Sequence, residues 1–94
     1  MTKSLLSNER VCYRCGTTLN LQKHHIYNGG LRKLADAYGC WVWLCMDCHV
    51  GSRGVHTTHG GRVYWDSLKA ECQRKFEEEY THEEFMRLFR RNNL

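Results

Sequence analysis

The sequence lacks the features that would point to a repetitive, secreted or membrane protein. It has 94 residues, no proline, and no internal repeat or low-complexity stretch. The longest apolar run, Trp41 to Leu44, is far too short to cross a bilayer, so we expect no membrane association. Residues 1–10 contain no apolar core followed by a small-residue cleavage site, which predicts no signal peptide and a cytoplasmic location.

A chain of this length forms one domain, which we place over residues 1–94, and it buries only a modest core. Such domains often depend on a metal ion or on disulfides for their stability. The six cysteines are therefore informative. With no export signal and two pairs written as Cys-x2-Cys, zinc is favoured over three disulfides in a secreted protein, an alternative that a thiol count would decide.

Two short cysteine motifs carry the strongest signal. Cys12 and Cys15 form the first, Cys45 and Cys48 form the second, and 29 residues separate the two motifs. Four thiolates at this spacing predict one closed tetrahedral zinc site, which is structural because it has no open position for a substrate. The other two cysteines, of which Cys72 lies on the apolar stripe of an expected helix, should stay outside this site.

Hydrophobic periodicity and turn residues predict a small α+β domain with two helices in its C-terminal third. Those two helices carry no recognisable chemistry and are expected to be scaffold. A capping box begins the second of them. The expected elements are a loose arm (1–11), a strand (19–27), a helix (31–38) ended by Gly39, a strand (40–44), a loop-like or broken helical stretch (51–61), a helix (66–79) and a helix after Thr81.

Five of the six histidines lie near the cysteine motifs. His24 and His25 are adjacent on an expected strand, so their side chains point to opposite faces and should do different work. His49 directly follows the second motif, so bound zinc would fix its direction and leave it available for a second metal ion. His56 and His59 have a spacing that suits a metal on a helix, although nearby glycines weaken that reading. The ordinary alternative for each is a solvated or core histidine.

Positive charge is concentrated in the first two thirds of the chain. Residues 1–65 carry eight Lys/Arg and three Asp/Glu, whereas residues 66–94 carry six and seven. A positive surface beside a metal site suits a polyanion such as DNA, although an excess of this size is ordinary for a soluble domain. Several of these cations could equally be solvated. The candidates for contacts with a nucleic-acid backbone are Arg14, Lys23, Arg32, Lys33, Arg53 and Arg62.

The order of these motifs resembles a known family. The chain is similar to the zinc-containing branch of the HNH endonucleases, which are His-Me finger or ββα-metal nucleases. The motifs that carry this resemblance are, in order, Cys-x2-Cys, His-His-Ile, an apolar strand that leads into Leu-Cys-x2-Cys-His, and Gly-Val-His. Residues 29–33 and the C-terminal ending are similar to small HNH proteins of bacteriophages. The resemblance implies a treble-clef-like ββα-metal core over residues 12–60 and a helical scaffold over residues 65–94.

The resemblance also assigns roles to the histidines. His25 matches the general base, and His24 and His49 match ligands of a catalytic divalent ion such as Mg²⁺, Mn²⁺, Ni²⁺ or Zn²⁺. His56 matches a further ligand, although many members place that histidine four residues after the first, where this chain has Arg53. Cys40 stands where many members have the middle asparagine, so the group that orients His25 is open, and a backbone carbonyl could serve.

The implied activity is hydrolysis of phosphodiester bonds in DNA, by nicking or by double-strand cleavage, which leaves 5′-phosphate and 3′-hydroxyl ends. The implied location is the cytoplasm of a bacterial host, the implied partner is DNA, and no small-molecule organic cofactor is expected. A neutral histidine near its ordinary pKa can take a proton from water, which is consistent with this chemistry. The competing hypothesis is a non-catalytic zinc module that binds DNA or a protein, and such a module does not need the His24, His25 and His49 set.

Overall fold

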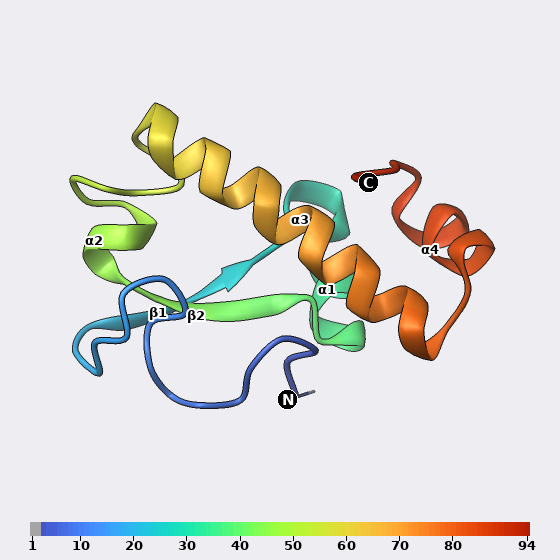
Figure 1. The fold of residues 1–94 in the computed structure, drawn as a ribbon, viewed down its shortest axis with the longest axis horizontal. Helices are drawn as coiled ribbons and strands as arrows, with labels where there is room; N and C mark the ends of the chain where they lie inside the picture. Colours follow the sequence, from blue (N-terminus) through green and yellow to red (C-terminus); the bar gives the residue numbers. More distant parts are fainter. Residues whose placement is uncertain (1–2) are drawn as a thin grey trace.

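Two antiparallel strands, β1 (Leu21–His25) and β2 (Trp41–Cys45), form the sheet of the computed structural model, which describes residues 3–94 (Figure 1). Their register places His24 opposite Val42 and His25 opposite Trp41. A 3-10 turn, η1 (Gly29–Leu31), and helix α1 (Arg32–Tyr38) connect the strands. The small α+β class expected from the sequence is confirmed, with β1 shorter than the expected strand (19–27) and β2 shifted by one residue from the expected strand (40–44).

Gly39 ends α1 in the left-handed conformation, with φ of 75°, as expected for a helix C-cap. It also lets the N-terminal segment approach, because a Cβ on Gly39 would lie 2.2 Å from the Lys3 carbonyl oxygen. The Leu5 amide donates to the Gly39 carbonyl, and the buried Ser4 hydroxyl donates to the Trp41 carbonyl at 2.6 Å. The expected loose arm is therefore wrong for Ser4 and Leu5, which are hydrogen-bonded to β2 and to the end of α1, while residues 1–2 lie outside the described part.

Helix α2 (Met46–His49) follows β2 directly, and a loop leads from it to the long helix α3 (His59–Glu79). We expected this helix to begin near residue 66, but it begins at His59 and includes two glycines. Thr58 caps it by accepting a hydrogen bond from the Gly61 amide at 2.9 Å. A Cβ on Gly61 would lie 1.9 Å from the Gly54 carbonyl oxygen, so this glycine is needed where the helix meets the preceding loop.

Helix α3 crosses the sheet, and helix α4 (His82–Phe89) lies beyond its C-terminal end (Figure 1). The expected apolar stripe is buried at Leu68, Cys72 and Phe76, and α4 adds Phe85 and Phe89 to the same core. The capping box at the start of α4 is half formed. Its N-cap hydroxyl accepts from the amide three residues on, at 3.0 Å, whereas the glutamate side chain pairs with an arginine of α4 instead.

In the described part of the chain, no helix combines the length and apolar character needed to span a bilayer.

Candidate metal centres and the adjoining pocket

The two cysteine motifs meet in space and form the four-cysteine cluster, Cys12, Cys15, Cys45 and Cys48. Their four Sγ atoms all lie within 4.8 Å of one another, and Cys15 Sγ is 3.7 Å from Cys45 Sγ. All six cysteines of the chain are free thiols, and Cys72, with the one remaining cysteine, lies in the apolar core outside this cluster. The cluster can therefore hold one metal ion between the first motif and the end of β2.

The backbone of each motif is shaped to turn its two thiols inward. In the first motif the Gly16 amide donates to the Cys12 carbonyl at 2.8 Å, and Gly16 adopts a φ of 81°, which suits glycine. In the second motif Cys45 is the N-cap of α2, and its sulfur accepts from the Cys48 amide at 3.4 Å. Local turns thus present the thiols in pairs, and the sheet brings the pairs together.

The electrostatics of the cluster favour a cation. Burial opposes ionisation of Cys12, but hydrogen bonds from backbone groups outweigh it and lower the pKa of this thiol to about 6. For Cys48, burial and then hydrogen bonds with the neighbouring thiols raise the pKa. A first thiolate thus forms readily, while further negative charge among the sulfurs is disfavoured. A bound cation would remove that repulsion, since metal-ligating cysteines are thiolates.

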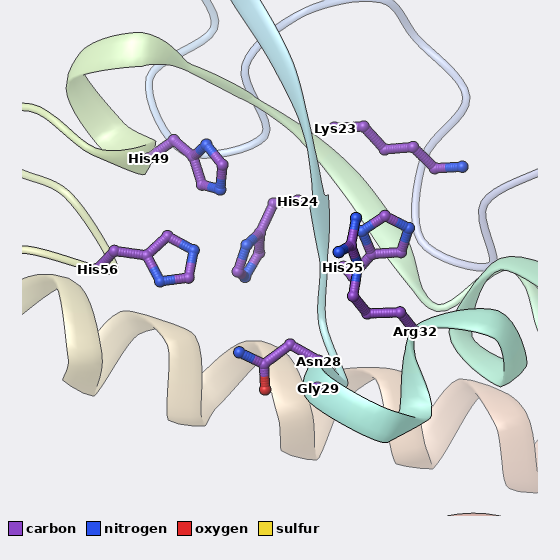
Figure 2. A pocket seen from close by; sticks show the side chains of 8 residues that line it. All are labelled: Lys23, His24, His25, Asn28, Gly29, Arg32, His49 and His56. Carbon is purple, nitrogen blue, oxygen red and sulfur yellow. The ribbon is translucent and has the colours of Figure 1, made fainter.

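Three histidines form a second group, the trihistidine cluster: His24 on β1, His49 at the end of α2, and His56 in the loop before α3. One nitrogen from each ring lies within 4.8 Å of the others, and Figure 2 shows the three rings facing one another on one side of β1. The ring centroids of His49 and His56 are 4.8 Å apart, and that of His24 lies 5.3 Å from His49. This group can also hold a metal ion.

His24 is the buried member of the trihistidine cluster, with 1% of its surface exposed. Its Nε2 atom is buried and makes no hydrogen bond to any group of residues 3–94. Burial, together with the neighbouring His49 and His56, lowers the pKa of His24 to about 3, so the ring is neutral at neutral pH. An unpaired buried nitrogen costs about 1–3 kcal/mol, whereas as a metal ligand the same lone pair would be satisfied.

Neighbouring groups orient the other two members. The Nδ1 atom of His49 lies 2.8 Å from Gln22 Oε1, and because a carbonyl oxygen only accepts, the proton sits on Nδ1 and leaves Nε2 with its lone pair. The loop after α2 folds back so that the His56 amide donates to the His49 carbonyl at 3.2 Å. This backbone hydrogen bond places His56 beside His49, although His56 lies outside helix α2. No sequence motif marks Gln22, because its role rests on one long-range contact with His49.

Trp65 closes the trihistidine cluster from the side of α3. Its ring lies 4.8 Å from His24 and 4.9 Å from His56, centroid to centroid, and both contacts are edge-on. Its indole nitrogen donates to the Ile26 carbonyl at 2.8 Å, which fixes the ring against the end of β1. Trp65 is the first residue of the expected helical scaffold (65–94), and the structure places it against two of the candidate ligands.

The trihistidine cluster opens into a cavity of about 350 Å³, the main pocket. His25 also lines it, and so do two cations, Lys23 and Arg32, whereas no carboxylate appears among the described residues of its lining (Figure 2). A second hollow shares His25 and Arg32 with the main pocket and continues to Lys33 and Asp36. The pocket is thus positively charged and suits an anion.

His25 lies on the opposite side of β1 from His24, as strand alternation predicted (Figure 2). Its side chain is 15% exposed, and its Nε2 atom lies 3.1 Å from Asp36 Oδ1 on α1. The Lys23 ammonium pairs with the same carboxylate oxygen. Hydrogen bonding to Lys23, opposed by slight burial and reinforced by the charge of Lys23, lowers the pKa of Asp36. Asp36 was not among the residues that the sequence singled out.

The remaining cations that the sequence singled out lie away from the lining of the main pocket. Arg14 donates to the Arg53 carbonyl and covers the Tyr64 ring, and Arg53 pairs with Asp47 beside the second cysteine motif. Arg62 is exposed on α3. Lys23, Arg32 and Lys33 are therefore the candidate nucleic-acid contacts that the structure groups beside the histidines.

Two other sequence candidates also lie apart from the pocket. His59 is exposed at the start of α3 and is not a member of the trihistidine cluster. Cys40 is fully buried in the core. A side-chain hydrogen bond with Cys72, and then burial, raise the pKa of Cys40.

No protein-family model, curated protein or solved structure matches this chain.

Proposed function

We propose that this protein is a metal-dependent endonuclease of the HNH, or His-Me finger, type that hydrolyses phosphodiester bonds in DNA. The observation that carries the proposal is the trihistidine cluster, in which one nitrogen of each ring lies within 4.8 Å of the others and the Nε2 atom of His24 is buried and unpaired. A cluster of three imidazoles in a pocket lined by Lys23 and Arg32, with His25 beside it, supplies the groups that phosphodiester hydrolysis needs. A non-catalytic zinc module has no use for this arrangement.

The ion proposed for the four-cysteine cluster is zinc. Tetrahedral zinc with Zn–S bonds of about 2.3 Å places neighbouring sulfur atoms roughly 3.8 Å apart. The Cys15 and Cys45 sulfur atoms are 3.7 Å apart, which is close to that value. A four-thiolate shell leaves no open position, so the proposed role of this ion is to hold the knuckles of a ββα-metal, treble-clef-like core together.

The trihistidine cluster fits a second divalent ion of the transition series. Imidazole nitrogen suits Zn²⁺ and Ni²⁺, whereas Mg²⁺ prefers carboxylate, carbonyl and water oxygens. His24, His49 and His56 offer three nitrogens, which leaves further positions for water and phosphate. We therefore expect Ni²⁺ or Zn²⁺ to support activity best, Mn²⁺ less well and Mg²⁺ least.

In this proposal His25 is the general base that removes a proton from the attacking water. A neutral imidazole that titrates near neutral pH is suited to this step and typically contributes about 10²–10⁴-fold. Lys23 and Arg32 would bind the phosphodiester oxygens as the chain passes the pocket. A divalent ion in the trihistidine cluster would supply Lewis-acid stabilisation of negative charge on the phosphate and on the departing 3′ oxygen, which gives 5′-phosphate and 3′-hydroxyl ends.

The direct test is cleavage of supercoiled plasmid by the zinc-containing protein in the presence of Ni²⁺, Zn²⁺, Mn²⁺ or Mg²⁺. We expect His25→Ala to lose at least about 10²-fold in rate without loss of bound metal. His24→Ala and His49→Ala should weaken binding of the second ion, so that excess metal partly rescues His49→Ala. A ligase should reseal the nicks, because the expected ends are its substrates.

His59→Ala is the matched control, since His59 is an exposed histidine outside the cluster. It should cut like the unaltered protein. If His25→Ala cuts as fast as the unaltered protein, or if no metal supports cleavage, the endonuclease proposal is wrong and a binding module becomes the better reading.

A further inference from the structure

The contact between His25 and Asp36 joins two elements that are distant in the chain. His25 ends β1 and Asp36 lies on α1, and the two side chains meet at 3.1 Å between Nε2 and Oδ1. Nothing in the local sequence requires this contact. It also decides which nitrogen of His25 carries a proton, because an ionised carboxylate oxygen can only accept a hydrogen bond.

We propose that Asp36 is the positioning residue for His25: its carboxylate holds the proton on Nε2, fixes the ring, and leaves Nδ1 as the nitrogen that accepts a proton from water. This inference rests on the proposed function of His25 as general base. Asp36 does not touch the reacting phosphate in this scheme and acts only through the imidazole.

The state of Asp36 supports this role. The hydrogen bond from Lys23 is the main cause that lowers the pKa of Asp36, so the carboxylate is ionised at neutral pH. Lys23 therefore serves a second purpose besides its charge, because it keeps the hydrogen-bond acceptor of His25 ionised. The Lys23 side chain is held in turn over the Trp41 ring, 4.8 Å from its centroid.

The place of Asp36 in its helix supports the same role. It lies in the last turn of α1, where the helix macrodipole disfavours a negative side chain by about 0.3–1 kcal/mol. Helix formation alone therefore gives no reason for an aspartate at this position. Its contacts with Lys23 and His25 provide one.

Cys40, which stands where the resemblance implies an orienting asparagine, does not orient His25. The Cys40 side chain is fully buried and is not part of the main-pocket lining. The Cys40 carbonyl already accepts a hydrogen bond from the Ile26 amide at 3.0 Å. Asp36 thus takes over a function that comes from a different part of the sequence in the family that this chain resembles.

The first experiment follows the Nε2 proton of His25 by NMR of histidine-labelled protein, which needs no enzymatic activity. In the zinc-containing protein we expect a proton on Nε2 whose exchange with water is slowed. Asp36→Ala should lose this protection, and Asp36→Asn, which keeps an oxygen acceptor, should retain part of it. Asp66→Ala, an exposed aspartate of α3, is the matched control and should change nothing. Unchanged exchange in Asp36→Ala would overturn the proposal.

The second experiment measures plasmid cleavage. Asp36→Ala should lower kcat about ten- to hundredfold, within the total contribution of a general base, and should leave the affinity for the second ion unchanged. In the His25→Ala background the same change should have no further effect on kcat, because Asp36 acts on kcat through His25. A double variant that cuts more slowly than His25→Ala would assign Asp36 a merely structural role. If the protein cuts no DNA but shows the protected proton, the proposed endonuclease function is wrong, whereas the hydrogen bond between Asp36 and His25 is supported.

Discussion

At the scale of single residues, the candidate site is defined by atoms whose hydrogen-bonding capacity is already assigned. Gln22 contacts Nδ1 of His49 and Asp36 contacts Nε2 of His25, whereas Nε2 of His24 is buried and has no hydrogen-bond partner among residues 3–94. Each ring therefore presents one defined nitrogen to its surroundings. Outer partners of this kind fix the tautomer and the orientation of a ligand before the ion arrives.

A substitution at Gln22 tests whether this partner orients the His49 ring. Replacement by alanine removes the acceptor from His49 Nδ1, so the ring can rotate or exchange its tautomer. Loss of such a partner typically costs about 10–100-fold in metal affinity, and we expect a loss in this range for the trihistidine cluster. Isothermal titration of the zinc-containing protein with Ni²⁺ would measure it. Thr18→Ala, at an exposed position before β1, should leave the affinity unchanged, and an equal affinity for Gln22→Ala would contradict the assigned role.

Much of the candidate site could be predicted from the sequence, because its main residues are marked by local spacing. The four cysteines and His49 belong to short motifs, and strand alternation separates His24 from His25. The partners of these residues leave no such mark. Gln22, Asp36 and Trp65 act through long-range contacts, so only the packing of β1 against α1, α2 and α3 identifies them.

At the scale of elements, helix α3 shows where sequence patterns fail. Two successive glycines argue against a helix, since each costs roughly 1 kcal/mol relative to alanine. Helix α3 nevertheless runs through Gly60 and Gly61, because tertiary contact overrides propensity there. The helix packs so close to the loop that carries His56 that no side chain fits at Gly61. By contrast, α1 ends before Gly39 and α4 begins after Thr81, as the capping residues predicted.

The two glycines of α3 should respond in opposite ways to alanine. Gly61→Ala would force the helix away from the Gly54 carbonyl and should destabilise the protein by about 1–3 kcal/mol. Gly60 has open space around the same position, so Gly60→Ala should be neutral or stabilising by up to about 1 kcal/mol. Urea unfolding of the two zinc-containing variants measures both. Equal stabilities would mean that α3 does not approach the loop this closely.

At the scale of the whole molecule, a small chain relies on a few long-range constraints. The core joins the sheet to α3 and α4 through side chains such as Ile26, Phe76 and Phe85, which are fully buried. The four-cysteine cluster adds a further long-range constraint, because it joins the first cysteine motif to the end of β2 and to α2. An ion in that cluster would cross-link these segments and so supplement the modest core of a small chain.

Removal of that ion should therefore unfold the protein. Structural zinc supplies roughly 10 kcal/mol or more of apparent free energy, which is comparable to the whole stability of a small domain. Cys12→Ser and Cys48→Ser should give largely unfolded chains by circular dichroism. Cys72→Ala should stay folded and keep one zinc per chain by elemental analysis. Folded protein without zinc, or loss of zinc in Cys72→Ala, would show that the ligand set is wrong.

Helix α2 belongs to both clusters, since Cys45 caps it, Cys48 lies within it and His49 ends it. An ion on the cysteines would hold the short backbone segment that aims His49, so occupancy of one cluster raises affinity at the other, and the coupling is reciprocal. A partly demetallated sample would then contain mainly fully loaded and empty molecules. Its specific activity would follow the zinc bound to sulfur, and an excess of Mg²⁺, which binds thiolates poorly, would not restore the empty fraction.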